Sequence, residues 1–175
     1  MARYVLRVAI AIAAVWVLSG CSSGNPIVSV VRGNLAYGRG DYQGALVHYL
    51  STSQQNSNRG WLLFNTGNVY YALGEQEAAL TAWEDARNAL VDPDAEAAGG
   101  GSTNLLIHAA SYNRGVLFYQ RGEYRDAYDE FRYALSVNSQ SLSAKANLEL
   151  SLQKIRSAEQ AQEIGGGTAR EETEG

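Results

Sequence analysis

The sequence predicts an all-α protein, a short α-solenoid of about three helix pairs followed by a C-terminal capping helix. One observation behind this prediction is the pattern Gly-x-x-[Tyr/Phe]-x-x-x-Gly-x-x-x-x-Ala-x-x-x-[aromatic]-x-x-Ala, which occurs twice in full and once with two substitutions. The other is its spacing, because the first two copies differ by 34 residues and the last two by 48. A period near 34 is typical of stacked helix-turn-helix units that bury each other's apolar faces.

Each copy places small residues where two helices can approach and an aromatic residue beside them. We expect the glycine between the two helices to take the left-handed conformation that ends a helix. Copy one departs from the pattern at Ala36 and Thr52. The anchors are Gly33, Gly40, Ala45 and Tyr49 in copy one, Gly67, Tyr70, Gly74, Ala79, Trp83 and Ala86 in copy two, and Gly115, Phe118, Gly122, Ala127, Phe131 and Ala134 in copy three.

The apolar pattern and the turn residues predict seven helices between residues 28 and 160. Asp41 and Thr103 are the expected N-caps. The expected helices are 28–37, 42–54, 61–73, 77–90, 105–121, 124–137 and 141–157. The corresponding repeats are 28–55, 59–91 and 104–138, with a cap at 141–158.

Two segments lack an apolar period. Residues 92–103 contain three consecutive glycines and account for the longer spacing, so we expect a flexible insertion there. Residues 161–175 are rich in glycine and glutamate and predict a disordered acidic tail. Either segment could dock a partner, or both could be flexible connections. Glu149 stands where the earlier repeats have a glycine, which suits a capping helix with one side in water.

These residues resemble the tetratricopeptide repeat (TPR) family, which pairs a Trp-x-x-Leu-Gly-x-x-Tyr helix with an Ala-x-x-x-Phe helix and closes with proline. The closing proline is poorly kept, since Pro93 follows copy two late and the other copies lack it. The resemblance implies a right-handed solenoid whose first helices line a concave groove. It also implies a protein partner held in that groove.

The amino terminus resembles a bacterial lipoprotein signal. Arg3 and Arg7 precede an apolar stretch at residues 8–18, shorter than the ~20 residues that span a membrane. Leu-Ser-Gly-Cys follows and ends at Cys21, the only cysteine of the chain. The resemblance implies a signal peptide at 1–20, acylation (palmitate included) of Cys21, and an acylated tether at 21–27. The alternative is an ordinary signal peptide with a coincidental cysteine.

The net charge of the chain limits the classes of partner that it can bind, and the residue after Cys21 indicates its location. Without residues 1–20 the formal charge changes from −4 to −6, and an acidic domain argues against nucleic acid. We expect a cell-envelope protein, lipid-anchored and facing the periplasm. Ser22, and not Asp, follows Cys21. By the sorting rule of enteric bacteria, this favours the outer membrane over the outer leaflet of the inner membrane.

The sequence offers no enzymatic constellation. It contains no His-Glu-x-x-His, Cys-x-x-Cys or P-loop pattern, so we expect no catalytic residue, metal, cofactor or small-molecule substrate. His48 and His108 occupy unrelated places in their repeats and are expected to be surface or half-buried residues. The adjacent acids at 84–85 and 129–130 cannot share a helical face, and we expect them to be solvated surface.

The resemblance places an asparagine and tyrosine surface in the groove. Asparagine can both donate to and accept from a peptide backbone, and tyrosine adds rigid apolar area with a polar tip. In this family such asparagines also bond neighbouring helices. The candidate partner-binding residues are Asn34, Tyr37, Asn65, Asn68, Tyr71, Tyr112, Asn113, Tyr119 and Asn147. Val30, Phe64, Val116, Ala146 and Leu150 complete the expected groove.

The groove residues can be compared with those of repeat domains that bind a C-terminal carboxylate. Asn34 and Asn65 match the asparagines of repeat domains that clamp a C-terminal carboxylate, but the cations of that clamp are replaced by Val30, Ala109 and Asn113. Without cations, carboxylates would lose their charge-assisted bonds. We therefore expect an uncharged extended or helical segment.

The favoured hypothesis is a membrane-anchored, non-catalytic adaptor or scaffold with a membrane or envelope protein as partner. Residues 112–115 and 144–150 resemble Bat-type (aerotolerance operon) repeat proteins, thought to act beside von Willebrand A-domain proteins and a MoxR-type ATPase. The alternative is a pilotin- or assembly-type lipoprotein that guides outer-membrane or pilus subunits. An enzyme or its accessory subunit is a third hypothesis, disfavoured because no convergent polar site is visible.

Overall fold

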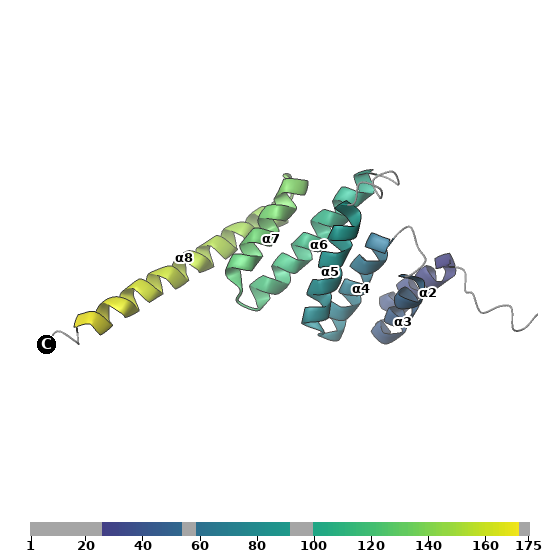
Figure 1. Cartoon of the computed structure of the whole chain (residues 1–175), viewed down its shortest axis with the longest axis horizontal. Coiled ribbons are helices and arrows are strands. Elements are labelled where there is room, and N and C mark those ends of the chain that lie inside the picture. The colour runs from purple at the N-terminus through teal and green to yellow at the C-terminus, as the bar shows by residue number, and fades with distance from the viewer. Residues whose placement is uncertain (1–25, 54–58, 92–99, 172–175) are drawn as a thin grey trace, which may run out of the picture. The chain divides into compact units, whose positions relative to one another are not determined.

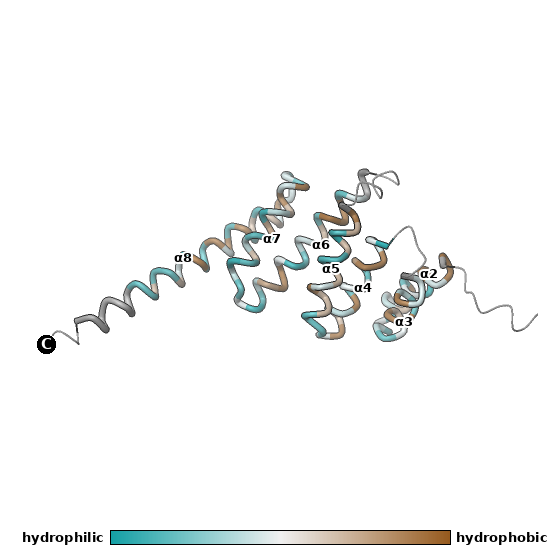
Figure 2. The backbone as a smooth tube through the Cα atoms, viewed as in Figure 1, coloured by the Kyte–Doolittle hydropathy of each residue, from teal (hydrophilic) through white to brown (hydrophobic). Residues whose placement is uncertain are grey.

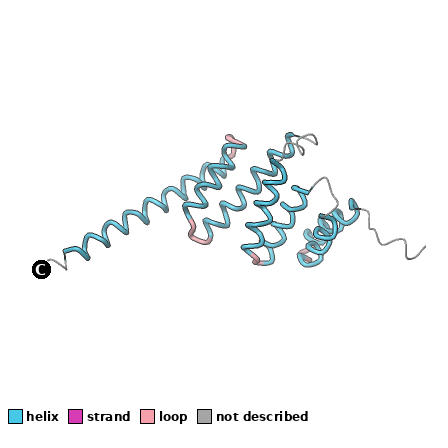
Figure 3. Tube along the Cα trace, viewed as in Figure 1, coloured by secondary structure: helices cyan, strands magenta, loops and turns pink. Residues whose placement is uncertain are grey.

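The computed structural model (Figure 1) describes residues 26–53, 59–91 and 100–171. Within these ranges the chain consists of helices and short turns, and no strand occurs (Figure 3). The all-α prediction is therefore confirmed. The predicted signal peptide, Cys21, most of the tether and residues 92–99 of the predicted insertion lie outside the described residues.

The helices fall into two compact units. Unit 1 (Met1–Gln55) contains α2 (Pro26–Gly38) and α3 (Tyr42–Ser53), which pack against each other. In unit 2 (Asn56–Gly175) each helix packs against the next one in the chain. The helices of unit 2 are α4 (Arg59–Leu73), α5 (Gln76–Val91), α6 (Gly100–Gln120), α7 (Tyr124–Val137) and α8 (Leu142–Glu171).

Three glycines end the first helix of each pair as predicted. Gly40, Gly74 and Gly122 have φ values of 79°, 80° and 80°, a conformation that other residues rarely adopt. In each turn the amide after the glycine donates to the carbonyl five residues earlier, a Schellman motif. These bonds join Asp41 to Ala36, Glu75 to Tyr70 and Glu123 to Phe118, each at 2.9 Å.

A second set of glycines lets the paired helices touch an aromatic ring. A methyl group at Gly67 would come within 2.5 Å of Trp83 Cδ1, far inside van der Waals contact. The same contact joins Gly33 to Tyr49 at 2.5 Å and Gly115 to Phe131 at 2.7 Å. The predicted close approach of the helices is therefore confirmed in all three pairs. Ala45, Ala79 and Ala127, the small residues opposite, are fully buried.

The core of unit 2 joins one helix pair to the next. Ala79, Leu80 and Trp83 of α5 form a buried cluster with Ala110 and Leu117 of α6. Figure 2 shows apolar and hydrophilic stretches alternating along the helices of this unit, as expected where each helix buries one side. The stacking of repeats thus depends on contacts between consecutive pairs.

Helix α7 matches its predicted bounds, and the largest differences are at the start of α6 and the end of α8. α6 begins at Gly100, so Thr103 lies inside the helix and is not its N-cap. Small polar residues fit that first turn because its N–H groups have no intrahelical partner in any case. α8 runs to Glu171, past the predicted end at 158 and into the predicted tail. The alanine, glutamate and glutamine residues at 158–163 are strong helix formers and explain why the helix continues past Ser157, whereas helix propensity does not explain its passage through the three glycines at 165–167.

Two helices begin at residues whose side chains cap them. Asp41 Oδ1 accepts a bond of 2.9 Å from the Gly44 amide, which confirms the predicted cap of α3. Ser141 Oγ accepts from the Ala144 amide at 3.3 Å at the start of α8. Local side chains therefore fix where these helices begin.

We expect Gly115→Ala to destabilise unit 2 by about 1–3 kcal/mol, because the new methyl group would overlap the Phe131 ring. Urea unfolding followed by circular dichroism would measure the change. Gly38→Ala is the control, since nothing lies within 4 Å of the position, and it should be neutral or stabilising by less than ~1 kcal/mol. Equal effects of the two substitutions would contradict the close-approach explanation.

Candidate functional site

The first helices of successive pairs adjoin in unit 2, where α4 contacts α6 and α6 contacts α8. Three side-chain hydrogen bonds described below cross between these helices. We call the surface that they share the inner face. It consists of Asn65, Asn68 and Tyr71 on α4, Tyr112, Asn113, Tyr119 and Gln120 on α6, and Asn147 on α8.

Asn68 is the hub of the inner face. Its Oδ1 accepts a hydrogen bond from Trp83 Nε1 at 3.0 Å and another from Asn113 Nδ2 at 3.1 Å. The first bond holds the two helices of one pair together, and the second reaches the next pair. Asn68 therefore supports the fold as well as lining the candidate surface.

Unit 1 contains the same bond at the equivalent position. Tyr49 donates its hydroxyl proton to Asn34 Oδ1 at 2.6 Å, and both pairs of residues are 15 apart in sequence. In the third pair the equivalent residues are Val116 and Phe131. Polar partners thus occur together in two repeats, and an apolar pair replaces both in the third. The asparagine therefore occurs only where the aromatic residue opposite it can donate a hydrogen bond.

Two further bonds connect the inner helices of unit 2. Asn147 Nδ2 donates to the Tyr112 hydroxyl at 3.0 Å and joins α8 to α6. The Tyr71 hydroxyl donates to Gln120 Oε1 at 3.1 Å and joins α4 to α6. Sequence reasoning missed Gln120, although it directly follows the candidate residue Tyr119.

Part of this surface is available to a partner. Tyr71 is 41% exposed, and Asn65 makes no side-chain hydrogen bond with another described residue. Asn68, Asn113 and Asn147 each use one atom of the side-chain amide, and no bond within the described residues engages the other atom. These three side chains are half-buried. Each can thus present a donor or an acceptor while it keeps its structural bond.

The candidate residues of unit 1 lie on α2. Asn34 is exposed, and Tyr37 is 38% exposed and packs on Tyr42 with ring centroids 5.4 Å apart. The equivalent pair in unit 2, Tyr119 and Tyr124, is 5.2 Å apart. Each of these rings packs on the first aromatic residue of the helix that follows.

Burial raises the pKa of two tyrosines of unit 1. The pKa of Tyr37 is raised, first by burial and then by Tyr42. The pKa of Tyr49 is raised as well, by burial and then by Tyr37. A protonated hydroxyl is required for Tyr49 to donate to Asn34, so the raised pKa extends the pH range of this bond further into the alkaline region.

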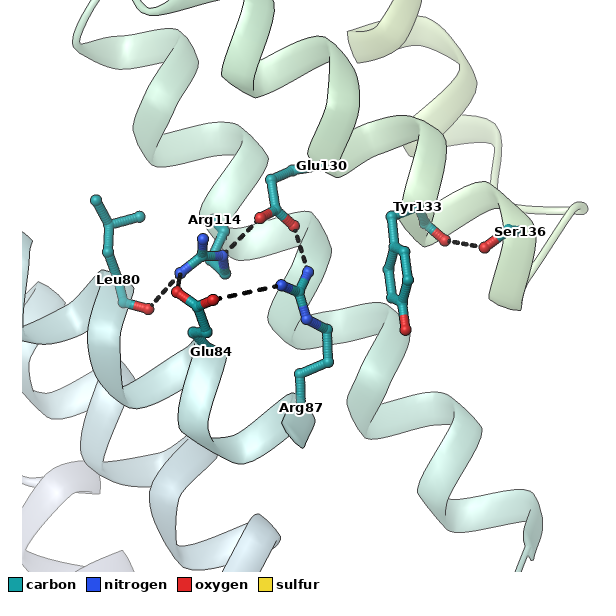
Figure 4. A network of polar contacts seen from close by, with 7 residues as sticks. All are labelled: Leu80, Glu84, Arg87, Arg114, Glu130, Tyr133 and Ser136. Carbon is teal, nitrogen blue, oxygen red and sulfur yellow. Dashed lines mark hydrogen bonds and ion pairs between the residues drawn. The ribbon is translucent and has the colours of Figure 1, made fainter. Parts of the chain in front are cut away.

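A charged cluster joins α5, α6 and α7 (Figure 4). Arg114 donates to Glu130 Oε1 at 2.7 Å and to the Leu80 carbonyl at 2.6 Å. Arg87 donates to the other oxygen of Glu130 at 2.9 Å. Glu84 lies 3.2 Å from the Arg114 guanidinium. Every charge in the cluster therefore has an opposite partner.

The expectation that Glu130 is solvated surface is wrong. Its residue is 9% exposed, and Arg114 is 8% exposed. Two carboxylates and two guanidinium groups satisfy one another, which makes the burial possible. The sequence carries a weak signal of this arrangement, because Glu130 falls in the buried stripe of α7 with Ala127, Phe131 and Ala134. Glu84 remains half in solvent.

The described residues contain no group of three or more His, Cys, Asp or Glu side chains that could hold a metal ion. His108 is half-buried and stacks on Tyr112, with centroids 6.2 Å apart. None of the described helices is both long and apolar enough to cross a membrane.

No family model matches the chain. A TPR repeat-containing protein of Methanocaldococcus jannaschii is 24% identical over 159 residues, which cover 74% of this chain and 28% of that protein. The chain therefore spans little more than a quarter of its relative's length. The Sgt2 TPR domain from Aspergillus fumigatus superposes with a TM-score of 0.58 at 23% identity, covering 77% of this chain and 82% of that one.

The chain has the fold of a TPR domain. A further solved structure is the first TPR of Spaghetti (RPAP3) bound to the HSP90 peptide SRMEEVD, with a TM-score of 0.58, 18% identity and coverage of 75% of this chain and 93% of that one. The N-terminal domain of STI-1 from C. elegans has a TM-score of 0.61 at 22% identity and covers 71% of this chain and 93% of that one. TPR domains generally mediate protein–protein interactions.

We expect Asn68 and Trp83 to show a favourable coupling energy of about 1 kcal/mol or more in a double-mutant cycle. Asn68→Val leaves the indole N–H of buried Trp83 without its acceptor. Adding Trp83→Phe removes that donor and recreates the apolar pair of the third repeat. The double variant should therefore lose less stability than the two single variants lose in sum. Denaturant unfolding of the four proteins measures the cycle, and strictly additive losses would contradict the inferred interaction.

We expect Glu130→Gln to destabilise unit 2 by about 3–5 kcal/mol, because it leaves two poorly solvated guanidinium groups without their shared carboxylate. Asp129→Asn is the matched control on the neighbouring residue. Its ion pair with Arg132 is largely exposed, so the loss should stay below ~1 kcal/mol. Thermal unfolding in low salt measures both variants. A loss no larger at Glu130 than at Asp129 would show that the cluster contributes little.

Proposed function

We propose that this protein is a non-catalytic adaptor of a bacterial cell envelope. Acyl chains on Cys21 hold it in the membrane with the repeats facing the periplasm, and the outer membrane is the favoured location. Its inner face binds a segment of an envelope protein. The sequence of the amino terminus supports the anchor, and the fold supports the interaction role.

The observation that carries the binding proposal is the chemistry of the inner face. It displays asparagine, glutamine and tyrosine side chains and no charged residue among the eight that define it. The internal bonds fix several of these side chains before a partner arrives, which lowers the entropic cost of binding. The unused amide atoms suit the N–H and C=O groups of a peptide backbone.

The same chemistry selects among ligands. The RPAP3 domain was solved with an acidic peptide, which cationic side chains recognise best. Positions 109 and 113 of this chain carry alanine and asparagine, and position 30 of unit 1 carries valine. We therefore propose an uncharged segment, extended or helical, as the ligand.

The resemblance of residues 112–115 and 144–150 to Bat-type repeat proteins suggests a finer assignment. In this version the partner is a von Willebrand A-domain membrane protein that works with a MoxR-type ATPase. Asn113 and Arg114 lie in the resembling stretch. Asn113 belongs to the inner face, whereas Arg114 belongs to the buried charged cluster.

Copurification from detergent-solubilised membranes tests the adaptor proposal. We expect Asn65→Ala combined with Tyr71→Ala to abolish recovery of the partner, since loss of ~2 kcal/mol at one hot-spot tyrosine weakens binding roughly thirtyfold. The matched control combines Asn88→Ala with Tyr133→Ala on the second helices, where Tyr133 is 39% exposed. The control protein should retain the partner.

Circular dichroism must show that both double variants keep their helices. If the inner-face variant retains the partner and the control loses it, the binding surface lies on α5 and α7. If both variants retain it, the inner face is not the binding site. Either result would overturn the site assignment.

A further inference from the structure

Helix α2 exposes one apolar stripe. Ile27, Val28, Val31 and Leu35 are 71%, 42%, 50% and 52% exposed. At 100° per residue these four positions fall within about 100° of the helix circumference, so they share one side. Asn34 adjoins the stripe, about 20° from Ile27 on the helix circumference, whereas Tyr37 lies about 80° outside it.

The repeats explain why this side is apolar. Val28 and Leu35 correspond, 82 residues later, to Ala110 and Leu117 of α6. Both of those residues are fully buried against α5, the second helix of the preceding pair. No helix pair precedes α2 among the described residues. The stripe is therefore equivalent to a face that packs on the preceding helix pair in unit 2, and it is apolar here although no described pair precedes it.

Two arginines border the stripe. Arg32 and Arg39 are exposed, and neither forms an ion pair with another described residue. By helical angle, Arg32 lies beside Val28 and Leu35 at one edge of the stripe. By contrast, five arginines of unit 2 are paired with carboxylates, namely Arg87, Arg114, Arg121, Arg125 and Arg132.

The two units also differ in charge. Residues 26–53 carry two arginines and one aspartate, a net charge of +1. Residues 56–175 carry 10 basic and 17 acidic residues, a net charge of −7. Of these two segments, the one with a positive balance is the one that carries the apolar stripe. An apolar helix face bordered by basic residues is the pattern of helices that lie in a membrane interface.

We propose that the apolar stripe of α2 lies on the phospholipid bilayer, with Arg32 and Arg39 at the level of the headgroups. This inference rests on the proposed acylation of Cys21. Cys21 is five residues from Pro26, so the start of α2 lies within ~18 Å of the anchor. The stripe then acts as a second contact, which strengthens anchoring and orients unit 1 on the membrane.

A bilayer fits this face better than a second copy of the chain. In a symmetric pair of α2 helices the arginines of both copies would adjoin the same contact and repel each other. Anionic headgroups would instead neutralise them, since negatively charged lipids attract basic residues close to the surface.

The test uses the full chain, lipidated and reconstituted in vesicles of phosphatidylethanolamine and phosphatidylglycerol. Val31→Cys provides a thiol on the stripe for an environment-sensitive fluorophore, and acylated Cys21 does not compete for the label. Brominated lipids should quench this fluorophore several-fold more strongly than one at Val47→Cys. Val47 is an equally apolar residue of α3 that is 67% exposed, and its equivalents Thr81 and Asp129 are also exposed.

Adding Arg32→Glu and Arg39→Glu to the labelled protein should reduce quenching at position 31 while the protein still floats with the vesicles. Equal, weak quenching at positions 31 and 47 in vesicle-bound protein would overturn the inference and leave the anchor intact. A blue shift at position 31 that depends on protein concentration and not on brominated lipid would identify a second copy as the occupant. Failure of the protein to float would refute the anchor itself.

Discussion

The contact on which the rest of the structure depends is a glycine against an aromatic ring within each helix pair. The absence of a side chain at Gly67 brings Trp83 into direct contact with the backbone of α4. Because Asn68 follows that glycine, the indole N–H of Trp83 can donate to the side-chain oxygen Oδ1 of Asn68. The same geometry recurs in unit 1 with Tyr49 and Asn34. One steric feature therefore sets the helix separation and also places a polar group on the inner face.

The inner face is consequently both scaffold and candidate binding surface. Its asparagines use one atom of the amide to hold neighbouring helices and leave the other atom unused within the described residues. Such a surface is fixed before binding, so an incoming segment need not order it. The charged cluster of α5, α6 and α7 supports the same repeats from other helices, because Arg114 joins Leu80 of α5 to Glu130 of α7. The partner-binding proposal rests on this division of roles.

The two units of the chain also differ in net charge and in exposed apolar surface. The positive balance and the exposed apolar stripe both belong to α2 and its turn, whereas unit 2 is acidic and pairs most of its arginines internally. A lipid anchor a few residues before α2 would bring the first of these regions to the bilayer, while acidic repeats would avoid anionic lipid. The membrane and binding proposals therefore concern different surfaces of the protein.

The sequence by itself determined the repeat period, the helix pairs, the left-handed glycines and the glycine–aromatic contacts, because these depend on local conformation and on residue size at fixed spacing. Only the tertiary structure decided which asparagine oxygens are used, that Gln120 joins the inner face, and that Glu130 is buried. These outcomes depend on contacts between side chains about 40 residues apart in the sequence, and a local sequence pattern does not show which such side chains will meet. The extent of α8 was also missed, because helix-forming residues continue it past Ile155, after which the side chains as far as Glu163 are exposed.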